Sequence, residues 1–369
     1  MTMISSTETK TPDDVKPAAS APKILEQLVQ QAERAGASDI HLQMRGKVAE
    51  VAFRLDGVIT PGAELPADVA ERVFGRIKFL SRLKTYQETL PQDGRIPREE
   101  LKSRNDLRVA TYPTVTGEKI VLRLFNSDTA RTLDELSLPH SARSELDKFL
   151  RQPGGLMLLT GPAGSGKTTT IYACLRQLAA AGGRHIITVE DPVEQVVAGT
   201  MQTEINEAIG LDFARAARHL LRQDPQVLIL GEIRDEATAQ LAVRAGLTGH
   251  LVISTLHAGS CQGVFERLLT MCADHSAVAS AVELVLNQRL IRKVCASCDG
   301  TGCETCLRTG YNGRVPLVEW LRVNDSLRER IRRRELTTLV PEQTLAAAAR
   351  SLVHQGVANE AEFKRIFGL

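Results

Sequence analysis

The chain has 369 residues, of which 43% are hydrophobic and 24% charged, which is ordinary for a globular protein and enough for two domains. Its 46 basic and 44 acidic residues leave a formal net charge of +2, so no overall field favours nucleic acid or an anionic membrane. No stretch approaches the roughly 18 apolar residues of a transmembrane helix, and no signal peptide is evident. Seven cysteines, four of them clustered, suit a metal site in a reducing compartment, so we expect a cytoplasmic protein.

The first part of the chain has the pattern of a small α+β domain, residues 23–126. Before it, residues 1–22 are rich in small and polar side chains and are expected to form a disordered leader. After it, residues 127–140 are polar, contain Pro139 and are expected to form a linker. The apolar spacing predicts helices from Lys23 to about Gly36 and from Ala67 to about Leu83, and strands at Asp39–Met44, Val48–Leu55, Leu107–Tyr112 and Glu118–Phe125.

From residue 141 to 369 the pattern changes to strands that alternate with helices. This alternation predicts an α/β domain with a mainly parallel sheet, helices on both faces, and a ligand at the carboxyl ends of the strands. A cysteine-rich segment, 293–315, and a helical tail, 321–369, follow. The expected strands are Leu156–Thr160, His185–Val189, Gln226–Leu230 and His250–Ser254, and the expected helices are Lys167–Ala181, Phe213–Arg222 and Glu236–Ala245.

A glycine-rich segment joins the first of these strands to a helix and has the P-loop pattern G-x-x-x-x-G-K-T. Its glycines let backbone N–H groups surround phosphate oxygens, and the helix start adds partial positive charge. Lys167 is expected to reach the β- and γ-phosphates, and the Thr168 hydroxyl to bind Mg²⁺. A glycine-rich turn without a ligand is the alternative, but the strand–loop–helix context favours ATP. The expected nucleotide-binding residues are Gly161, Pro162, Ala163, Gly164, Ser165, Gly166, Lys167, Thr168 and Thr169.

Acidic residues follow the next two expected strands. Glu190 and Glu232 would emerge beside the P-loop, where ATP hydrolysis needs one group near Mg²⁺ and another that orients or deprotonates water. Each could instead be a solvated loop acid or a helix cap. Many P-loop enzymes have Asp where this chain has Gly231, so Glu232 must take part of that duty. The sequence does not distinguish which glutamate is the base.

Two histidines flank the fourth expected strand. His257 at its carboxyl end could sense the γ-phosphate, whereas His250 at the other end is more typical of a structural hydrogen bond.

Four cysteines form two Cys-x-x-Cys pairs, which can hold Zn²⁺ in a closed, tetrahedral, structural site. Free or redox-active thiols are the alternative. Cys174, Cys261 and Cys272 fall on expected helices, where they would be small buried residues. The expected zinc ligands are Cys295, Cys298, Cys303 and Cys306.

A basic run with five arginines, Arg328 to Arg334, is more typical of a solvated helix face with interleaved Glu than of a lipid or partner site.

Several motifs together resemble the secretion ATPases of type II secretion and type IV pilus systems over residues 24–365. They are the P-loop, T-V-E-D-P-V-E from Thr188, G-E-I-R-D from Gly231, T-G-H…T-L-H-A from Thr248, and G-A-S-D-I-H and R-L-D-G in the first domain. The resemblance implies a PAS-like first domain, a RecA-like ATPase domain, a hexameric ring that binds ATP where domains meet, and an inner-membrane platform protein as partner.

The resemblance also implies site residues that composition does not indicate. It matches Arg108 and Arg123 to positions that reach the nucleotide from the first domain, and Arg218 and Arg222 to further nucleotide-site arginines. On residue type alone, all four would be solvated salt-bridge partners. In the family, the four cysteines mark the secretion and pilus-extension branch, although the spacer between the pairs is much shorter here than usual.

The resemblance predicts a cytoplasmic, hexameric, ATP-hydrolysing motor at the inner membrane that powers type II secretion or pilus-type fibre assembly. The resemblance does not include the extra N-terminal domain that many extension ATPases have, so a retraction-type motor remains an alternative. A nucleic-acid-handling RecA-like protein is a further alternative, disfavoured by the small net charge and 4% aromatic residues. A nucleotide-binding scaffold without turnover is disfavoured by the two acids.

Overall fold

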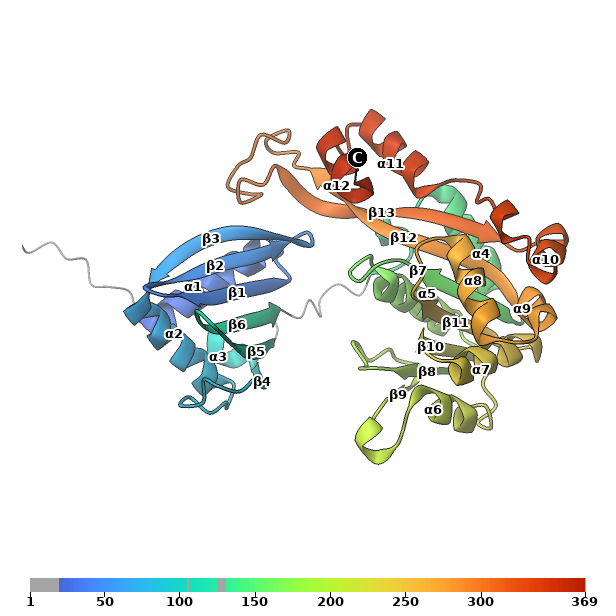
Figure 1. The fold of residues 1–369 in the computed structure, drawn as a ribbon, viewed down its shortest axis with the longest axis horizontal. Coiled ribbons are helices and arrows are strands. Elements are labelled where there is room, and N and C mark those ends of the chain that lie inside the picture. Colours follow the sequence, from blue (N-terminus) through green and yellow to red (C-terminus); the bar gives the residue numbers. More distant parts are fainter. Residues whose placement is uncertain (1–19, 105, 125–130, 369) are drawn as a thin grey trace, which may run out of the picture. The chain divides into compact units, whose positions relative to one another are not determined.

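The computed structural model describes residues 20–104, 106–124 and 131–368. The chain divides into two compact units, Met1–Asn126 and Ser127–Leu369 (Figure 1). Within the described ranges, no helix has the length and apolar character needed to cross a membrane. Most of the expected leader and the expected strand end at Phe125 lie outside the described residues.

Unit 1 is a six-stranded antiparallel sheet with the order β3-β2-β1-β6-β5-β4. Side chains alternate between its faces, so Ile40 and its cross-strand partners Phe53 and Leu122 are buried together, whereas their chain neighbours point to the other face. The elements are α1 Ala21–Arg34, β1 Asp39–Arg45, β2 Val48–Leu55, β3 Val58–Pro66, α2 Ala67–Leu80, β4 Gln92–Ile96, α3 Arg98–Leu101, β5 Leu107–Thr114 and β6 Gly117–Leu124.

Unit 2 is a seven-stranded sheet with the order β13-β12-β7-β11-β10-β8-β9, parallel except for the β12–β13 pair. Its strands are β7 Gly155–Thr160, β8 Ile186–Glu190, β9 Met201–Glu204, β10 Val227–Ile233, β11 Leu251–Leu256, β12 Val282–Val294 and β13 Tyr311–Arg322. Its helices are α4 His140–Leu150, α5 Lys167–Ala181, α6 Phe213–Leu220, α7 Glu236–Leu247, α8 Cys261–Met271, α9 His275–Ala281, α10 Asp325–Arg332, α11 Leu345–His354 and α12 Glu360–Phe367, with short 3₁₀ turns at Asp134–Leu136, Glu207–Ile209 and Leu336–Thr338.

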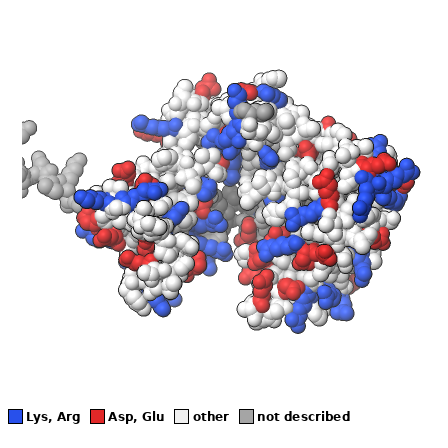
Figure 2. All heavy atoms as spheres, in the orientation of Figure 1, with Lys and Arg blue, Asp and Glu red and all other residues white. Residues whose placement is uncertain are grey.

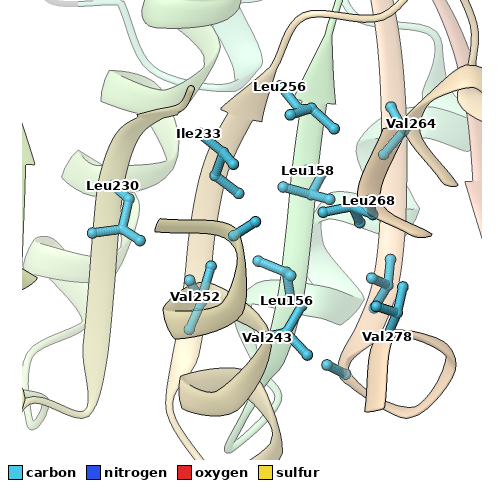
Figure 3. Close-up of a cluster of buried hydrophobic side chains, with 14 of the residues drawn as sticks. Leu156, Leu158, Leu230, Ile233, Val243, Val252, Leu256, Val264, Leu268 and Val278 are labelled. Atoms are coloured by element: carbon cyan, nitrogen blue, oxygen red, sulfur yellow. The ribbon is translucent and has the colours of Figure 1, made fainter. Parts of the chain in front are cut away.

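Helices cover both faces of this sheet, and the central strand β7 faces both layers. Leu156 and Leu158 pack with residues of α7, α8 and α9, as Figure 3 shows for Leu268 and its neighbours. Met157 and Leu159 belong to a second core with α4 and α5. All four side chains are fully buried. A strand that is buried on both faces reads as a continuous apolar run, which is why this strand was predictable from sequence.

The sequence predictions miss two long strands. β12 and β13 form an antiparallel hairpin with the cysteine segment at its tip, and β12 also pairs with β7. The last two residues of β13 therefore occupy the start of the expected helical tail, whose first helix begins at Asp325. The short edge strand β9 is also absent from the sequence predictions.

Two expected boundaries also differ. The expected linker falls within unit 2, and in its described part Leu133 and Leu136 are buried in the core that contains α4. The first helix begins at Ala21, inside the expected leader, with Pro22 in its first turn, where a missing N–H costs no helical hydrogen bond.

Candidate functional site

The P-loop lies between β7 and α5, and its backbone conformation requires glycine. Gly161, Gly164 and Gly166 have φ values of 134°, 72° and 88°. A Cβ on Gly161 would lie 2.2 Å from the Gln288 carbonyl oxygen, whereas one on Gly164 would meet nothing within 4 Å. The loop is therefore packed on one side and open on the other, as a phosphate cradle must be.

Gln288 of β12 holds the P-loop in this conformation. Its Nε2 donates to the Ser165 carbonyl oxygen at 2.9 Å, and its Oε1 accepts from the Thr170 hydroxyl at 2.9 Å. The side chain is 2% exposed, so both bonds are shielded from water. Sequence reasoning missed this residue, because its contacts are 118 and 123 residues away along the chain.

The first turn of α5 carries the expected phosphate and metal ligands. Lys167 Nζ donates to the carbonyl oxygens of Gly161 and Pro162, at 2.8 and 3.0 Å. Burial lowers the pKa of Lys167, and the charge of Glu232 partly opposes this shift. Thr168 and Thr169 are exposed at the helix start. The glycine cradle, the lysine and the hydroxyls fit the phosphates of a nucleotide and its Mg²⁺.

Glu190 ends β8 and is buried, with both carboxylate oxygens engaged by neighbours. Oε1 accepts from the Thr188 hydroxyl at 2.6 Å and from Gln202 Nε2 at 2.9 Å, and Oε2 accepts from the Tyr172 hydroxyl. Burial, followed by the hydrogen bond to Glu190, raises the pKa of Tyr172 well above its usual value. The Tyr172 oxygen also accepts from the Glu194 N–H at 3.0 Å. This network holds the carboxylate in one orientation.

Glu232 lies in a bulge of the neighbouring strand. The register of β10 against β11 shifts between Leu230 and Ile233, and the Thr255 hydroxyl donates to the Gly231 carbonyl oxygen at 2.9 Å. The bulge places Glu232 at the strand end, half-buried. A bulge of this kind re-aims a side chain beside a site.

Two cationic or polar side chains surround the Glu232 carboxylate. Arg234 forms an ion pair with it, and His257 Nε2 lies 3.4 Å from Oε2. Arg234 also lies 3.6 Å from Asp191, which follows Glu190, so it links the two strand ends. The sequence analysis assigned Arg234 no role, although it lies two residues after Glu232, directly beyond the end of β10.

The two histidines have different surroundings. The Thr160 hydroxyl, at the end of β7, exchanges two 2.8 Å hydrogen bonds with the backbone of Ala258, so the loop that carries His257 is fastened beside the P-loop. His250 Nδ1 lies 3.1 Å from both the Thr248 hydroxyl and the Ala245 carbonyl oxygen, at the opposite end of β11. These are structural contacts.

The four expected nucleotide-site arginines lie in two places. Arg218 on α6 and Arg222 just after it are exposed. Arg108 on β5 and Arg123 on β6 belong to unit 1, where they are direct cross-strand partners. Within unit 2 the structure therefore places Glu232 near His257 and Lys167, with Glu190 at the end of the neighbouring strand, and within unit 1 it pairs Arg108 with Arg123.

The clustered cysteines converge at the tip of the β12–β13 hairpin. Their four sulfur atoms lie within 4.8 Å of one another, and the Cys295–Cys303 and Cys298–Cys306 separations are both 3.9 Å. A tetrahedron with Zn–S bonds of about 2.3 Å has sulfur separations of about 3.8 Å. Backbone N–H groups also donate to the Cys306 sulfur. The short spacer therefore permits a geometry that fits Zn²⁺.

The other three cysteines are buried. Cys174 lies on α5 and Cys261 begins α8, whereas Cys272 ends α8 in an extended conformation. Burial raises the pKa of Cys174 to about 12 and that of Cys272 to about 11, so both are protonated at neutral pH.

Basic and acidic side chains lie close together on the face of unit 2 that Figure 2 shows. In the basic run, Arg333 lies 2.9 Å from Glu329, whereas Arg328 pairs with Glu283 of β12. The exposed part of the run therefore fits a solvated helix face, and Arg328 joins α10 to the sheet.

Comparisons with known proteins agree with this geometry. The family model described as "Type II/IV secretion system protein" matches residues 14–365. The type II secretion system protein HxcR of Pseudomonas aeruginosa is 39% identical over 93% of this chain and 75% of its own length. The pilus retraction motor PilT with bound ADP has a TM-score of 0.64 at 26% identity, covering 92% of this chain and 96% of PilT. The ATPase DotB of Legionella pneumophila has a TM-score of 0.71 at 20% identity, covering 97% and 98% of the two chains, and shows the shared fold.

Proposed function

The chain belongs to the type II/IV secretion system protein family, and from this premise we propose that it is an ATP-hydrolysing motor for type II secretion or type IV pilus assembly. The observation that carries the proposal is the convergence of three features at one edge of the unit 2 sheet. Lys167 begins α5 after the P-loop, Glu190 ends β8, and Glu232 is the second-last residue of the neighbouring strand β10. An open, glycine-lined loop completes the site.

We assign the roles from these positions. The P-loop backbone and Lys167 bind the phosphates, and the Thr168 hydroxyl holds Mg²⁺, which when bound neutralises charge between the β- and γ-phosphates. Glu190 and Glu232 would together orient the ligands of Mg²⁺ and the attacking water. Arg234 and His257 contact the Glu232 carboxylate at the strand end, and in this proposal His257 senses the γ-phosphate.

The motor acts as a hexameric ring at the cytoplasmic side of the inner membrane, with a platform protein as its partner. In this proposal Arg108, Arg123, Arg218 and Arg222 add positive charge for the ATP transition state to that of Lys167.

The cysteine site holds structural Zn²⁺. Its four sulfur atoms lie within 4.8 Å of one another at the hairpin tip, close enough to share one ion.

The test is ATP hydrolysis per subunit as protein concentration is raised. We expect the wild-type rate to rise steeply with concentration, Lys167→Ala to abolish it, and Arg108→Ala to reduce it strongly with the fold intact. Arg72→Ala, which removes an exposed arginine of unit 1 that pairs with exposed Asp68, is the matched control. A constant low rate that Arg108→Ala leaves unchanged would refute the assembled site.

A second pair of variants separates the two acids. Glu190→Gln and Glu232→Gln should both bind ATP, and the one with the larger loss of kcat identifies the group that activates water. Equal, small losses in both variants would contradict a role for either.

A retraction-type motor is the second candidate, because the PilT structure matches almost the whole chain. The test is expression of this chain in cells that lack the corresponding motor. If fibre retraction is restored, and secretion or fibre growth is not, the result favours a retraction-type motor. Salt-sensitive DNA binding by the purified chain would instead favour a nucleic-acid-handling protein.

A further inference from the structure

A row of three polar side chains crosses the sheet of unit 2 beside the loop that carries His257. Strand register pairs Asn287 of β12 with Thr160 of β7 on one side and with Glu319 of β13 on the other. Directly opposite residues of neighbouring strands point to the same face of a sheet. All three side chains are buried, with exposed fractions of 0% for Thr160, 1% for Asn287 and 8% for Glu319. We call this set the buried polar row.

Two members of the buried polar row bind the backbone of segment 257–261, which leads from β11 into α8. Asn287 Nδ2 donates to the Gly259 carbonyl oxygen at 3.2 Å. Glu319 Oε1 accepts from the Cys261 N–H at 3.2 Å. Because both side chains are buried, these hydrogen bonds are electrostatically stronger than they would be in water.

The third member, Thr160, binds the same segment at Ala258. Its hydroxyl donates to the Ala258 carbonyl oxygen and accepts from the Ala258 N–H, both at 2.8 Å. Successive positions of the segment are thus held by β7, β12 and β13, in the order in which these strands lie in the sheet. Arg267 of α8 adds a 2.9 Å hydrogen bond to the His257 carbonyl oxygen. The backbone that carries His257 is therefore fastened to four neighbouring elements.

The Asn287 amide can adopt only one of its two orientations. Its Nδ2 faces two acceptors, the Gly259 carbonyl oxygen and, at 3.4 Å, Glu319 Oε1. An amide oxygen has no hydrogen to donate, so the reversed amide would place an acceptor against two acceptors. Asn287 Oδ1 is buried and has no hydrogen-bond partner among the described residues. The contact with the loop is kept although it leaves this oxygen unsatisfied, which is uncommon and points to a functional role.

The segment held by the buried polar row begins at the candidate site. His257 Nε2 lies 3.4 Å from Glu232 Oε2. Gln288, which follows Asn287 on β12, holds the P-loop through the Ser165 carbonyl oxygen. Successive residues of a strand point to opposite faces. One strand therefore supports the P-loop through one residue and the segment of His257 through the residue before it.

We propose that Asn287 and Glu319 are positioning residues for ATP hydrolysis, which hold His257 beside the Glu232 carboxylate by fixing the segment 257–261. The inference rests on the proposed ATPase function and deepens it by adding two residues that contact neither nucleotide nor Mg²⁺. In that function His257 senses the γ-phosphate, which ADP lacks. Loss of either positioning residue should therefore impair turnover and leave ADP binding intact.

Asn287→Leu in the full chain tests the proposal, because leucine has a similar volume but removes both donated hydrogen bonds. We expect kcat for ATP hydrolysis to fall about tenfold, since a small misplacement of a group at the reaction centre is costly. KM and the Kd of a fluorescent ADP analogue should change less than about threefold.

Asn359→Leu is the matched control for lost stability. It removes the side chain that caps α12 and accepts a 3.0 Å hydrogen bond from Tyr311, so it should lower the unfolding midpoint. Because these contacts lie outside the buried polar row and its segment, kcat should stay within about twofold of the wild type.

The decisive measurement repeats Asn287→Leu in a His257→Ala background. If Asn287 acts through His257, the substitution should then change kcat less than about twofold, because the group that it positions is already gone. An equal, roughly tenfold loss in both backgrounds would show a purely structural effect and overturn the proposal. Wild-type kcat in Asn287→Leu or in His257→Ala would overturn it as well.

A second pair of variants decides the matter if Asn287→Leu does not fold. Glu319→Gln keeps a carbonyl oxygen that can accept from the Cys261 N–H, whereas Glu319→Met has a similar length and no such acceptor. We expect kcat close to the wild type in Glu319→Gln and about tenfold lower in Glu319→Met, with ADP affinity unchanged in both. Equal kcat in the two variants would overturn the proposal. Absence of ATP hydrolysis by the wild-type chain would instead overturn the proposed function, so the two failures are distinguishable.

Discussion

Gln288 should be as important to the P-loop as the loop's own glycines, and Gln288→Met tests this. Methionine has a similar volume but removes both hydrogen bonds, leaving the Ser165 carbonyl and the Thr170 hydroxyl buried without this partner. An unsatisfied buried group costs about 1–3 kcal/mol, so the two together should cost about 2–6 kcal/mol. For a unit of this size, each kcal/mol lowers the unfolding midpoint by about 2–4 °C, which predicts a loss of about 4–24 °C.

The assay is thermal unfolding of the full chain, followed by titration with a fluorescent ATP analogue. Nucleotide affinity should fall as well, because the released loop must be ordered again when phosphate binds. Gln262→Met is the matched control, since Gln262 on α8 makes its 2.7 Å hydrogen bond to Glu266 at the surface. If Gln288→Met unfolds within about 2 °C of the wild type and binds ATP equally well, Gln288 does not hold the loop and the reasoning is wrong.

Three further predictions concern other parts of the chain. Tyr172→Phe should cost about 1–3 kcal/mol of stability and lower kcat more than it changes KM, because Glu190 loses a buried donor; equal kinetics would argue against positioning by this hydroxyl. Cys298→Ser, or a strong chelator, should release one equivalent of zinc and expose the hairpin tip to proteolysis, and a metal-free wild-type protein would exclude the site. Glu362→Gln should cost about 3 kcal/mol, because Glu362 is fully buried against two arginines. Burial alone would raise the pKa of Glu362, but the hydrogen bonds and charges of those arginines lower it below 4.5. The free energy of unfolding of the wild type should therefore fall as the pH is lowered through the folded-state pKa. Urea unfolding measured at several pH values should show a weaker pH dependence for Glu362→Gln.

The recognisable parts of the candidate site are contiguous in sequence. The P-loop motif consists of a buried strand, a glycine-rich turn and a helix start that follow one another directly in the sequence. The turn needs positive φ angles, and the glycines that adopt them, such as Gly161 and Gly166, stand within the motif itself. The positions of Glu190 and Glu232 at one sheet edge were also predictable, because parallel strands carry their carboxyl ends to the same side.

The supports of that site were not predictable, because they come from distant segments. β12 lies beside β7 in the sheet although more than a hundred residues separate them, and its Gln288 closes on the P-loop. The sequence of β12 mixes apolar residues with polar residues that face buried partners. Its apolar residues therefore follow neither the two-residue alternation of a half-buried strand nor the 3.6-residue repeat of a helix. The buried leucines of the expected linker were hidden for the same reason, since their partners lie on α4 and the sheet.

By itself, the sequence determined the chemistry: a phosphate-binding loop, acids at strand ends and four thiols at metal-ligand spacing, since each depends on residues only a few positions apart. The tertiary structure alone decided which side chains support that chemistry. Strand register lines up Thr160, Asn287 and Glu319 beside the loop that carries His257, and strand order brings Gln288 to the P-loop. The physical reason is that register and order are set by the burial of whole faces, a property of all the strands together that no local spacing records.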